Sequence, residues 1–328
     1  MSELAVLGTG EYLLGVQSVF LVGPTAVGKS AVALELAKLI GAEIVSADSM
    51  QVYRGMDIGT AKPTAEERVR VPHHLIDLCE VSEPFDVKRF VDLASAALAE
   101  ISSRGKTPLI VGGTGLYVRA MRRGLFEGPS RNPKLRERLE EMTAAELFDE
   151  LQRVDPLTAK AIDRNNPRRL VRALEVFQET GKSIAELQKE WNGERGAKSA
   201  ERAEAIFCLN RLREDLYERI ERRIDAQIAA GWVDEVKRLL KRGLEKNATA
   251  LQAAGYRELV AHVRRELPLD ETVALIKIRT RQLAKRQMTW FRREPQLDWL
   301  EIGRDESPSD TVQRIHAIYK EMEKDSVS

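Results

Sequence analysis

The sequence predicts an α/β fold in which a parallel sheet is flanked by helices and interrupted by an all-helical insertion domain. Short apolar runs rich in β-branched residues are typical of buried strands. Such runs occur at 16–22, 43–46, 107–111 and 205–209. Apolar residues at helical spacing occupy 31–40 and 86–104. From about 124 to 203 prolines separate short amphipathic segments and no strand signal occurs, which indicates the insertion.

The turn between the first strand and the first helix matches G-x-x-x-x-G-K-[ST], a loop whose backbone N–H groups cradle a di- or triphosphate. Its glycines let the backbone approach phosphate oxygens, and the helix N-terminus adds partial positive charge. We expect Lys29 to reach the diphosphate and the Ser30 hydroxyl to ligate Mg²⁺. A glycine-rich turn could match by chance, but here strand, loop and helix stand in the required order. The sheet is therefore predicted to be P-loop NTPase-like, with a polyphosphate held by Gly23, Pro24, Thr25, Ala26, Val27, Gly28, Lys29 and Ser30.

Composition limits the remaining function classes. The 328 residues contain 52 Lys and Arg against 51 Asp and Glu, so net charge alone predicts no polyanionic partner. Only Cys79 and Cys208 are present, far apart, which excludes a disulfide framework or a C-x-x-C metal site. No run of 18 apolar residues occurs, and no Lys or Arg precedes Lys29 as a signal peptide would require. We therefore expect a cytoplasmic protein that does not bind a membrane.

The strand and helix signals divide the chain into four parts. Three glycines discourage structure in a short N-terminal tail. The core then runs up to the insertion, and a late strand returns the chain to the sheet before a set of C-terminal basic helices. The predicted boundaries are 1–15 for the tail, 16–123 for the first part of the core, 124–203 for the insertion and 204–328 for the remainder.

Two side chains follow strands at the edge of the sheet where α/β proteins bind ligands. Asp48 comes directly after the strand at 43–46, and Thr114 follows the strand at 107–111 in a second Gly-rich turn. Asp48 could instead cap a turn or a helix, and Thr114 could be a helix N-cap. The sequence leaves both alternatives open.

Adjacent histidines at His73 and His74 raise the question of a metal site. Neighbouring side chains on a strand point to opposite faces, so these two cannot easily share one ion. A structural or substrate-contacting role is favoured.

Clusters of basic residues provide candidate phosphate contacts. The segment 164–172 holds four arginines and no acid, and Arg168 and Arg172 share one helix face. Arg219 and Arg223 stand one helical turn apart and could grip a diphosphate together, or could pair with nearby carboxylates on their own helix. The segment 277–293 holds seven basic residues and no acid, beside two aromatic residues, which suits contacts with phosphates and unpaired bases. The alternative for 164–172 is a solvated helix face, and for 277–293 it is a helix with Ile278, Leu283, Met288 and Phe291 in the core and the other residues in solvent.

Together these motifs resemble the tRNA dimethylallyltransferases, also called isopentenyl-tRNA transferases. The similarity covers most of the chain in one order. The matching segments are GPTAVGKS at 23–30, ADSMQVYRGMDIGTAKP at 47–63, HHLIDL at 73–78, LIVGGTGLY at 109–117, NPRRLVRALEVF at 166–177, GYRE at 255–258 and TRQLAKRQMTWFR at 280–292. The zinc finger that eukaryotic members add is not found in this sequence, so the bacterial form is indicated.

The resemblance implies transfer of a dimethylallyl group from its diphosphate to the N6 amine of adenosine 37, beside the anticodon, in tRNAs that read codons beginning with U. It implies that Asp48 is the general base, that Thr114 and Lys29 take part in catalysis with Mg²⁺, and that Arg219 and Arg223 bind diphosphate. The residues implied to contact tRNA are Asp48, Ser49, Met50, Gln51, Thr114, Arg136, Arg168, Arg169, Arg172, Gly255, Tyr256, Arg257, Lys285, Arg286 and Arg292. The partners would be tRNA and dimethylallyl diphosphate, and we expect a monomer.

Two other functions fit a phosphate-binding loop. A small-molecule kinase should place an acid near a second Mg²⁺ contact, yet the strand at 107–111 ends in glycines without one. A non-catalytic RNA-binding protein would have no use for Asp48.

Overall fold

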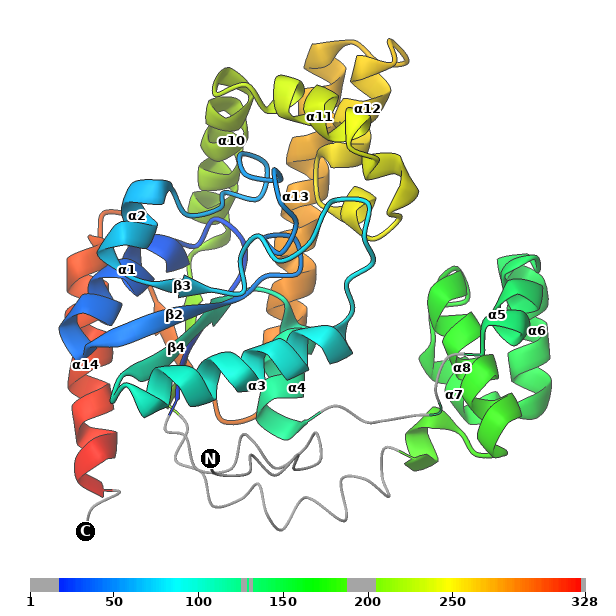
Figure 1. Ribbon diagram of the computed structural model, residues 1–328, viewed down its shortest axis with the longest axis horizontal. Helices are drawn as coiled ribbons and strands as arrows, with labels where there is room; N and C mark the ends of the chain where they lie inside the picture. The colour runs from blue at the N-terminus through cyan, green and yellow to red at the C-terminus, as the bar shows by residue number, and fades with distance from the viewer. Residues whose placement is uncertain (1–17, 125–128, 130–131, 188–204, 326–328) are drawn as a thin grey trace, which may run out of the picture. The chain divides into compact units, whose positions relative to one another are not determined.

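The computed structural model describes residues 18–124, 129, 132–187 and 205–325 (Figure 1). The predicted tail at 1–15 lies outside these residues, as do both ends of the predicted insertion. The chain divides into two compact units. One comprises Met1–Leu125 and Ala203–Ser328, and the other comprises Phe126–Arg202. Within the described residues, no helix is both long enough and apolar enough to span a membrane.

The larger unit is built on a six-stranded parallel sheet with strand order β3-β2-β4-β1-β5-β6. The strands are β1 (Val19–Val22), β2 (Ala42–Ala47), β3 (His73–His74), β4 (Thr107–Gly112), β5 (Ala205–Asn210) and β6 (Asp298–Glu301). β1 and β2 are buried along their whole length. Strands covered by helices on both faces are expected to be continuously apolar, and this is the signal that located them in the sequence.

Helices flank the sheet and connect its parallel strands. α1 packs against α14, and α3 packs against α4 (Figure 1). The helices up to the insertion are α1 (Lys29–Ile40), α2 (Ala65–Arg70), α3 (Val87–Ser103) and α4 (Gly115–Arg123). After the insertion come α10 (Arg213–Ala229), α11 (Trp232–Lys241), η1 (Leu244–Lys246), η2 (Ala250–Gln252), α12 (Tyr256–Val263), α13 (Leu269–Phe291) and α14 (Pro308–Asp325). α10 to α13 pack against one another as a helical group next to the ends of the strands (Figure 1).

The smaller unit contains only helices among its described residues, which agrees with the all-helical insertion that the sequence predicts. Each of these helices begins with an asparagine, threonine or aspartate at the N-cap. The side chain of this residue accepts a hydrogen bond from a backbone N–H group of the first turn. Prolines stand at or next to the first position of three of them, where the missing N–H costs nothing. Its own apolar core is formed by residues such as Leu147, Leu170 and Leu174. The helices are α5 (Pro133–Glu140), α6 (Ala144–Val154), α7 (Pro156–Ala161) and α8 (Pro167–Thr180).

Among the elements of the sheet unit without a counterpart in the sequence prediction are β6 and α2. β6 forms the edge of the sheet, three of its four residues are exposed, and Trp299 is among them. An edge strand of this kind carries no apolar run, so composition does not reveal it. α2 has no buried residue at all and is instead fixed by a capping box between Thr64 and Glu67.

Candidate active site

The loop at 23–30 takes the conformation that its glycines predict. Gly23 and Gly28 both have positive φ, at 144° and 115°. A Cβ on Gly23 would lie only 2.6 Å from the carbonyl oxygen of Leu209, so no other residue fits there. The Lys29 Nζ donates hydrogen bonds to the carbonyls of Gly23 and Pro24, at 2.9 and 2.8 Å. The loop therefore joins β1 to α1 with its lysine folded over it.

Three arginines approach the loop from the segment after β5. Arg211 donates to the Val27 carbonyl at 2.9 Å, and Arg219 donates to the Ala26 carbonyl at 2.9 Å. Arg223 lies 3.3 Å from the Thr25 hydroxyl. The sequence predicted Arg219 and Arg223 here but missed Arg211, whose signal is its position at the carboxyl end of a parallel strand.

Carboxylates close in sequence do not neutralise Arg219 and Arg223, which was the alternative left open by the sequence. These carboxylates pair with other arginines, in the ion pairs Asp215–Arg211, Glu218–Arg304 and Glu221–Arg281. Among the described residues, neither Arg219 nor Arg223 has an ion-pair partner. The guanidinium groups thus remain available to an anion at the loop.

Burial concentrates this positive charge. Desolvation lowers the pKa of Lys29 to about 8, an effect opposed by the Asp48 carboxylate and strengthened by Arg223. Burial also lowers the pKa of Arg223, and burial and then the neighbouring Arg211 lower the pKa of Arg219. Each of these pKa shifts arises because burial removes water from a cation. A bound diphosphate would stabilise the charge of all three cations.

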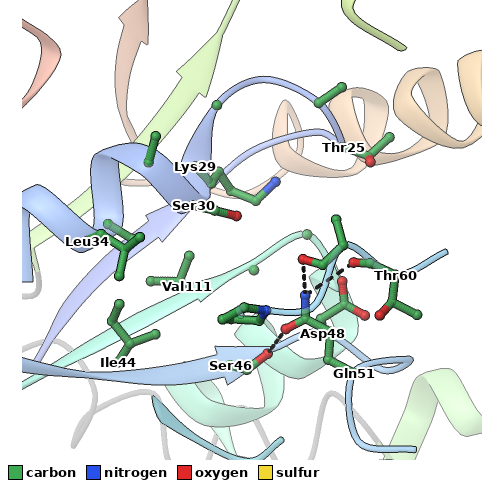
Figure 2. Close-up of a pocket in the computed structure, with 18 of the residues that line it drawn as sticks. Thr25, Lys29, Ser30, Leu34, Ile44, Ser46, Asp48, Gln51, Thr60 and Val111 are labelled. Carbon is green, nitrogen blue, oxygen red and sulfur yellow. Dashed lines mark hydrogen bonds between the residues drawn. The ribbon is translucent and has the colours of Figure 1, made fainter. Parts of the chain in front are cut away.

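The loop faces the ends of β2 and β4 across a cavity of about 480 Å³. Figure 2 shows Lys29 and Ser30 on one side of this cavity and Asp48 and Gln51 on the other. One end of the cavity is apolar, lined by Leu34, Ile44 and Val111. His73 also lines it, and burial lowers the pKa of this histidine, which favours the neutral imidazole.

The two adjacent histidines have separate partners. The His73 Nδ1–H group donates to the Val71 carbonyl at 2.7 Å, whereas the His74 Nε2 lies 2.7 Å from Glu43. No group of three metal-ligating side chains occurs within the described residues. The two histidines thus hold separate positions: His73 lines the larger cavity, and His74 lies beside Glu43.

A smaller cavity of about 160 Å³ adjoins the first. Ser49, Met50 and Thr114 line it, together with apolar residues of α10 and α13. Both cavities are lined by Thr25, Ala26, Asp48, Thr60, Arg223 and Gln287. Asp48 therefore lies where the larger cavity meets the smaller one.

Asp48 and Thr114 each make a hydrogen bond with the backbone that follows β2. One carboxylate oxygen of Asp48 accepts the Met50 N–H at 2.8 Å, so Asp48 does close a turn while it also lines both cavities. Thr114 is the N-cap residue of α4, but its hydroxyl makes no capping bond and instead accepts the Ser49 N–H at 3.1 Å. For both residues the structural and the functional alternative are compatible.

Gln287 is a site residue that sequence reasoning missed. Its side-chain oxygen accepts the Thr25 N–H at 2.9 Å, and its amide nitrogen donates to the Gly113 carbonyl at 3.0 Å. It thereby ties α13 to both the phosphate-binding loop and the Thr114 turn. Gln287 lies within the matching segment at 280–292, but its residue type does not indicate this role.

The residues expected to contact tRNA differ in their exposure, and two of them, Gly255 and Tyr256, are buried. Tyr256 is fully buried, and its hydroxyl donates a hydrogen bond to Glu235 at 2.7 Å, which is a structural contact. Gly255 is buried against the Trp232 ring. In the larger unit, the exposed residues among those expected to contact tRNA are Arg257, Lys285, Arg286 and Arg292.

In the insertion, Arg172 pairs with the buried Glu175 at 2.8 Å, and Arg136 lies 3.3 Å from Glu140. The arginine run is therefore less unbalanced than its sequence suggests, because Glu175 follows it on the same helix. Arg168 and Arg169 are exposed on α8.

Comparison with known proteins identifies the family. The family described as IPP transferase matches residues 51–294. The chain is 49% identical to tRNA dimethylallyltransferase 1 of Trichlorobacter lovleyi over 282 residues, which is 85% of this chain and 91% of that protein. It is 48% identical to tRNA dimethylallyltransferase of Geobacter metallireducens over 295 residues, covering 88% of this chain and 94% of the relative.

Solved structures agree with these matches. The full-length tRNA isopentenylpyrophosphate transferase of Bacillus halodurans superposes with a TM-score of 0.70 at 40% identity, covering 94% of this chain and 98% of that one. A eukaryotic dimethylallyltransferase acting on tRNA gives a TM-score of 0.72 at 27% identity, covering 93% and 78%. The phosphate-binding loop, the carboxylate opposite it and these similarities together place the chain in the tRNA dimethylallyltransferase (IPP transferase) family.

Proposed function

We propose that this enzyme transfers a dimethylallyl group from dimethylallyl diphosphate to the N6 amine of adenosine 37 in tRNA, with the diphosphate at the loop and the adenosine in the smaller cavity. The observation that carries the proposal is the position of Asp48 at the junction of the two cavities. A substrate in each cavity would bring donor carbon and acceptor nitrogen together beside one carboxylate.

The leaving group would be stabilised by the cations around the loop. The C–O bond to the diphosphate breaks as the C–N bond forms, so negative charge builds on the diphosphate oxygens. Lys29, Arg219 and Arg223 lie on that side of the cavity. Because they are already held by loop carbonyls and by Thr25, they need little reorganisation to meet this charge.

Mg²⁺ fits the residues that are present. Ser30 lines the cavity at the start of α1, and no cluster of carboxylates competes for an ion among the described residues. Mg²⁺ commonly combines one or two protein oxygens with substrate phosphates and water. Ser30 would hold it here, where the ion would supply further charge for the leaving group.

The nucleophile side depends on Asp48. An adenine amine is a weak nucleophile, and a carboxylate within hydrogen-bond reach of its proton assists as the new bond forms. The Met50 N–H orients one oxygen of Asp48. The Thr114 hydroxyl, 3.1 Å from the Ser49 nitrogen, lines the same compartment and would position the adenosine.

The base must leave its stack to reach this compartment, which costs least in a single-stranded loop such as that of the anticodon. We expect the exposed cations of α13 and α8 to contact the RNA, and we expect the enzyme to act as a cytoplasmic monomer.

Substitution of Asp48 by Asn tests the proposal. The amide keeps the shape and can still accept the Met50 N–H, but it cannot take the proton. We expect the rate of prenylation to fall by roughly 10²–10⁴ with little change in thermal stability. Mass spectrometry of nucleosides from reacted tRNA measures the product, and binding of tRNA and of dimethylallyl diphosphate serves as the control. If the variant is fully active but less stable, Asp48 only stabilises its turn and is not the general base.

A further inference from the structure

The loop at 57–60, which contributes lining residues to both cavities, is held by a buried carboxylate outside the site described above. Glu235 lies in the first turn of α11 and is 2% exposed. It accepts hydrogen bonds from three consecutive backbone N–H groups, those of Asp57 at 3.0 Å, Ile58 at 2.7 Å and Gly59 at 3.3 Å. The Tyr256 hydroxyl adds a fourth, at 2.7 Å.

This arrangement is an anion site filled by the protein itself. Successive N–H groups that point to one place are a common way to bind an anion. No lysine or arginine among the described residues forms an ion pair with Glu235. Its charge is therefore stabilised by N–H and O–H donors and by the N-terminal end of its own helix. A buried carboxylate so placed fixes the positions of all its donors at once.

The carbonyl side of the same loop is held from α10. Gln227 donates its amide to the carbonyls of Ile58 and Gly59, at 2.5 and 3.3 Å. Trp232 covers the loop, and a Cβ on Gly59 would lie 2.2 Å from its indole nitrogen. The loop is thus clamped on both its donor and its acceptor groups.

The clamped segment continues directly into the active site. Thr60 lines both cavities, and Gly59 lines the smaller one. The Gln51 amide nitrogen lies 3.3 Å from the Thr60 carbonyl, and its oxygen accepts the Ser46 hydroxyl at 2.9 Å (Figure 2). The position of the loop therefore sets both the shared wall and the orientation of Gln51.

From these contacts we propose that Glu235 is a positioning residue for the transfer reaction, acting through the loop at 57–60 on the compartment that receives the adenosine. The proposal rests on the proposed function. Glu235 touches neither cavity, whereas the phosphate-binding loop is held separately by Arg211 and Gln287. Its removal should therefore affect the transfer step and leave diphosphate binding intact.

Substitution of Glu235 by Gln tests this inference, with Asp234→Asn as the matched control. Asp234 is the neighbouring acid, but it is exposed and pairs with Lys237 at the surface. The amide introduced in Glu235→Gln would present an NH₂ group to backbone donors and displace the loop. A displacement of about 1 Å can cost as much as 10²-fold in rate. We expect the single-turnover rate constant of Glu235→Gln to fall roughly 10–100-fold, and that of Asp234→Asn to stay unchanged.

Single-turnover kinetics with saturating enzyme separate positioning from stability, because the rate constant reports folded enzyme only. Equilibrium binding of dimethylallyl diphosphate should match the wild type. An unchanged rate constant with a lower melting temperature would overturn the proposal, and so would an equal loss of diphosphate affinity. If Glu235→Gln does not fold, Tyr256→Phe removes one donor and should give a smaller loss of rate constant, roughly 2–10-fold. No product from the wild type would refute the proposed function, whereas these outcomes concern Glu235 alone.

Discussion

Two basic regions with the same sequence spacing behave differently in the structure. On α10, Arg219 and Arg223 stand four residues apart and both reach the phosphate-binding loop. On α8, Arg168 and Arg172 have the same spacing, but Arg172 turns to the buried Glu175 and to the Pro129 carbonyl. The first pair keeps its charge for a ligand, whereas Arg172 of the second pair stabilises the fold through Glu175.

The difference shows what spacing can and cannot predict. Residues four apart on a helix share a face, and this much follows from the sequence. Which groups oppose that face is decided by the tertiary structure. Around α10 the nearby carboxylates are taken by other arginines, whereas in α8 the carboxylate three residues further on pairs with Arg172 itself.

Removal of Lys29 should give the largest effect in the loop region. For Lys29→Ala we expect turnover to fall about 10²–10³-fold, because the leaving group no longer meets a preorganised donor, while tRNA binding stays nearly intact. The pKa of about 8 adds a pH test: the affinity of the free enzyme for dimethylallyl diphosphate should fall as pH rises through 8, because the lysine loses its charge. In Lys29→Arg that pH dependence should disappear. If Lys29→Ala turns over at the wild-type rate, the loop does not take part in the reaction.

Arg223 tests whether the α10 pair binds the ligand. We expect Arg223→Ala to weaken diphosphate binding and turnover by roughly 10–10²-fold, less than Lys29→Ala because Arg219 remains. Since Arg223 has no ion-pair partner in the described structure, its removal should not lower the melting temperature. Arg304→Ala is the control, because that exposed arginine pairs with Glu218 on the same helix as Arg223. Equal kinetics for the two variants would contradict the comparison.

The regular parts of the larger unit could be predicted because their signals are local. Buried parallel strands are mostly apolar, although β2 also buries Glu43 and Ser46, and the glycines of the phosphate-binding loop follow from its tight backbone. The ends of β2 and β4 pointed to Asp48 and Thr114, which the structure brings to one site.

The remaining site residues act through contacts between distant segments, and the sequence carries no signal for these. Gln287 lies 262 positions from Thr25, with which it shares a hydrogen bond. Glu235 stands next to the exposed Asp234 in a run that resembles a solvated helix surface. Tyr256 belongs to a segment that matches the family, yet its side chain is buried in the protein core. Motif membership therefore locates important residues without stating whether they touch the substrate.

Helix α8 offers the smallest and most specific test. Arg168→Ala with Arg169→Ala should weaken tRNA binding and reduce the salt slope of log K by about 0.7–0.9 for each phosphate interaction that the substitutions remove. Both side chains are exposed, so their removal should cost less stability than the loss of a buried ion pair. Arg172→Ala should instead lower stability and leave tRNA binding nearly unchanged. It leaves a buried carboxylate oxygen of Glu175 unpaired, at a cost of about 1–3 kcal/mol. Filter binding across a salt series and thermal unfolding of both variants measure the two effects. An unchanged slope in the double variant would mean that α8 does not contact the RNA. The exposed cations of α13 would then be the remaining candidates for these contacts.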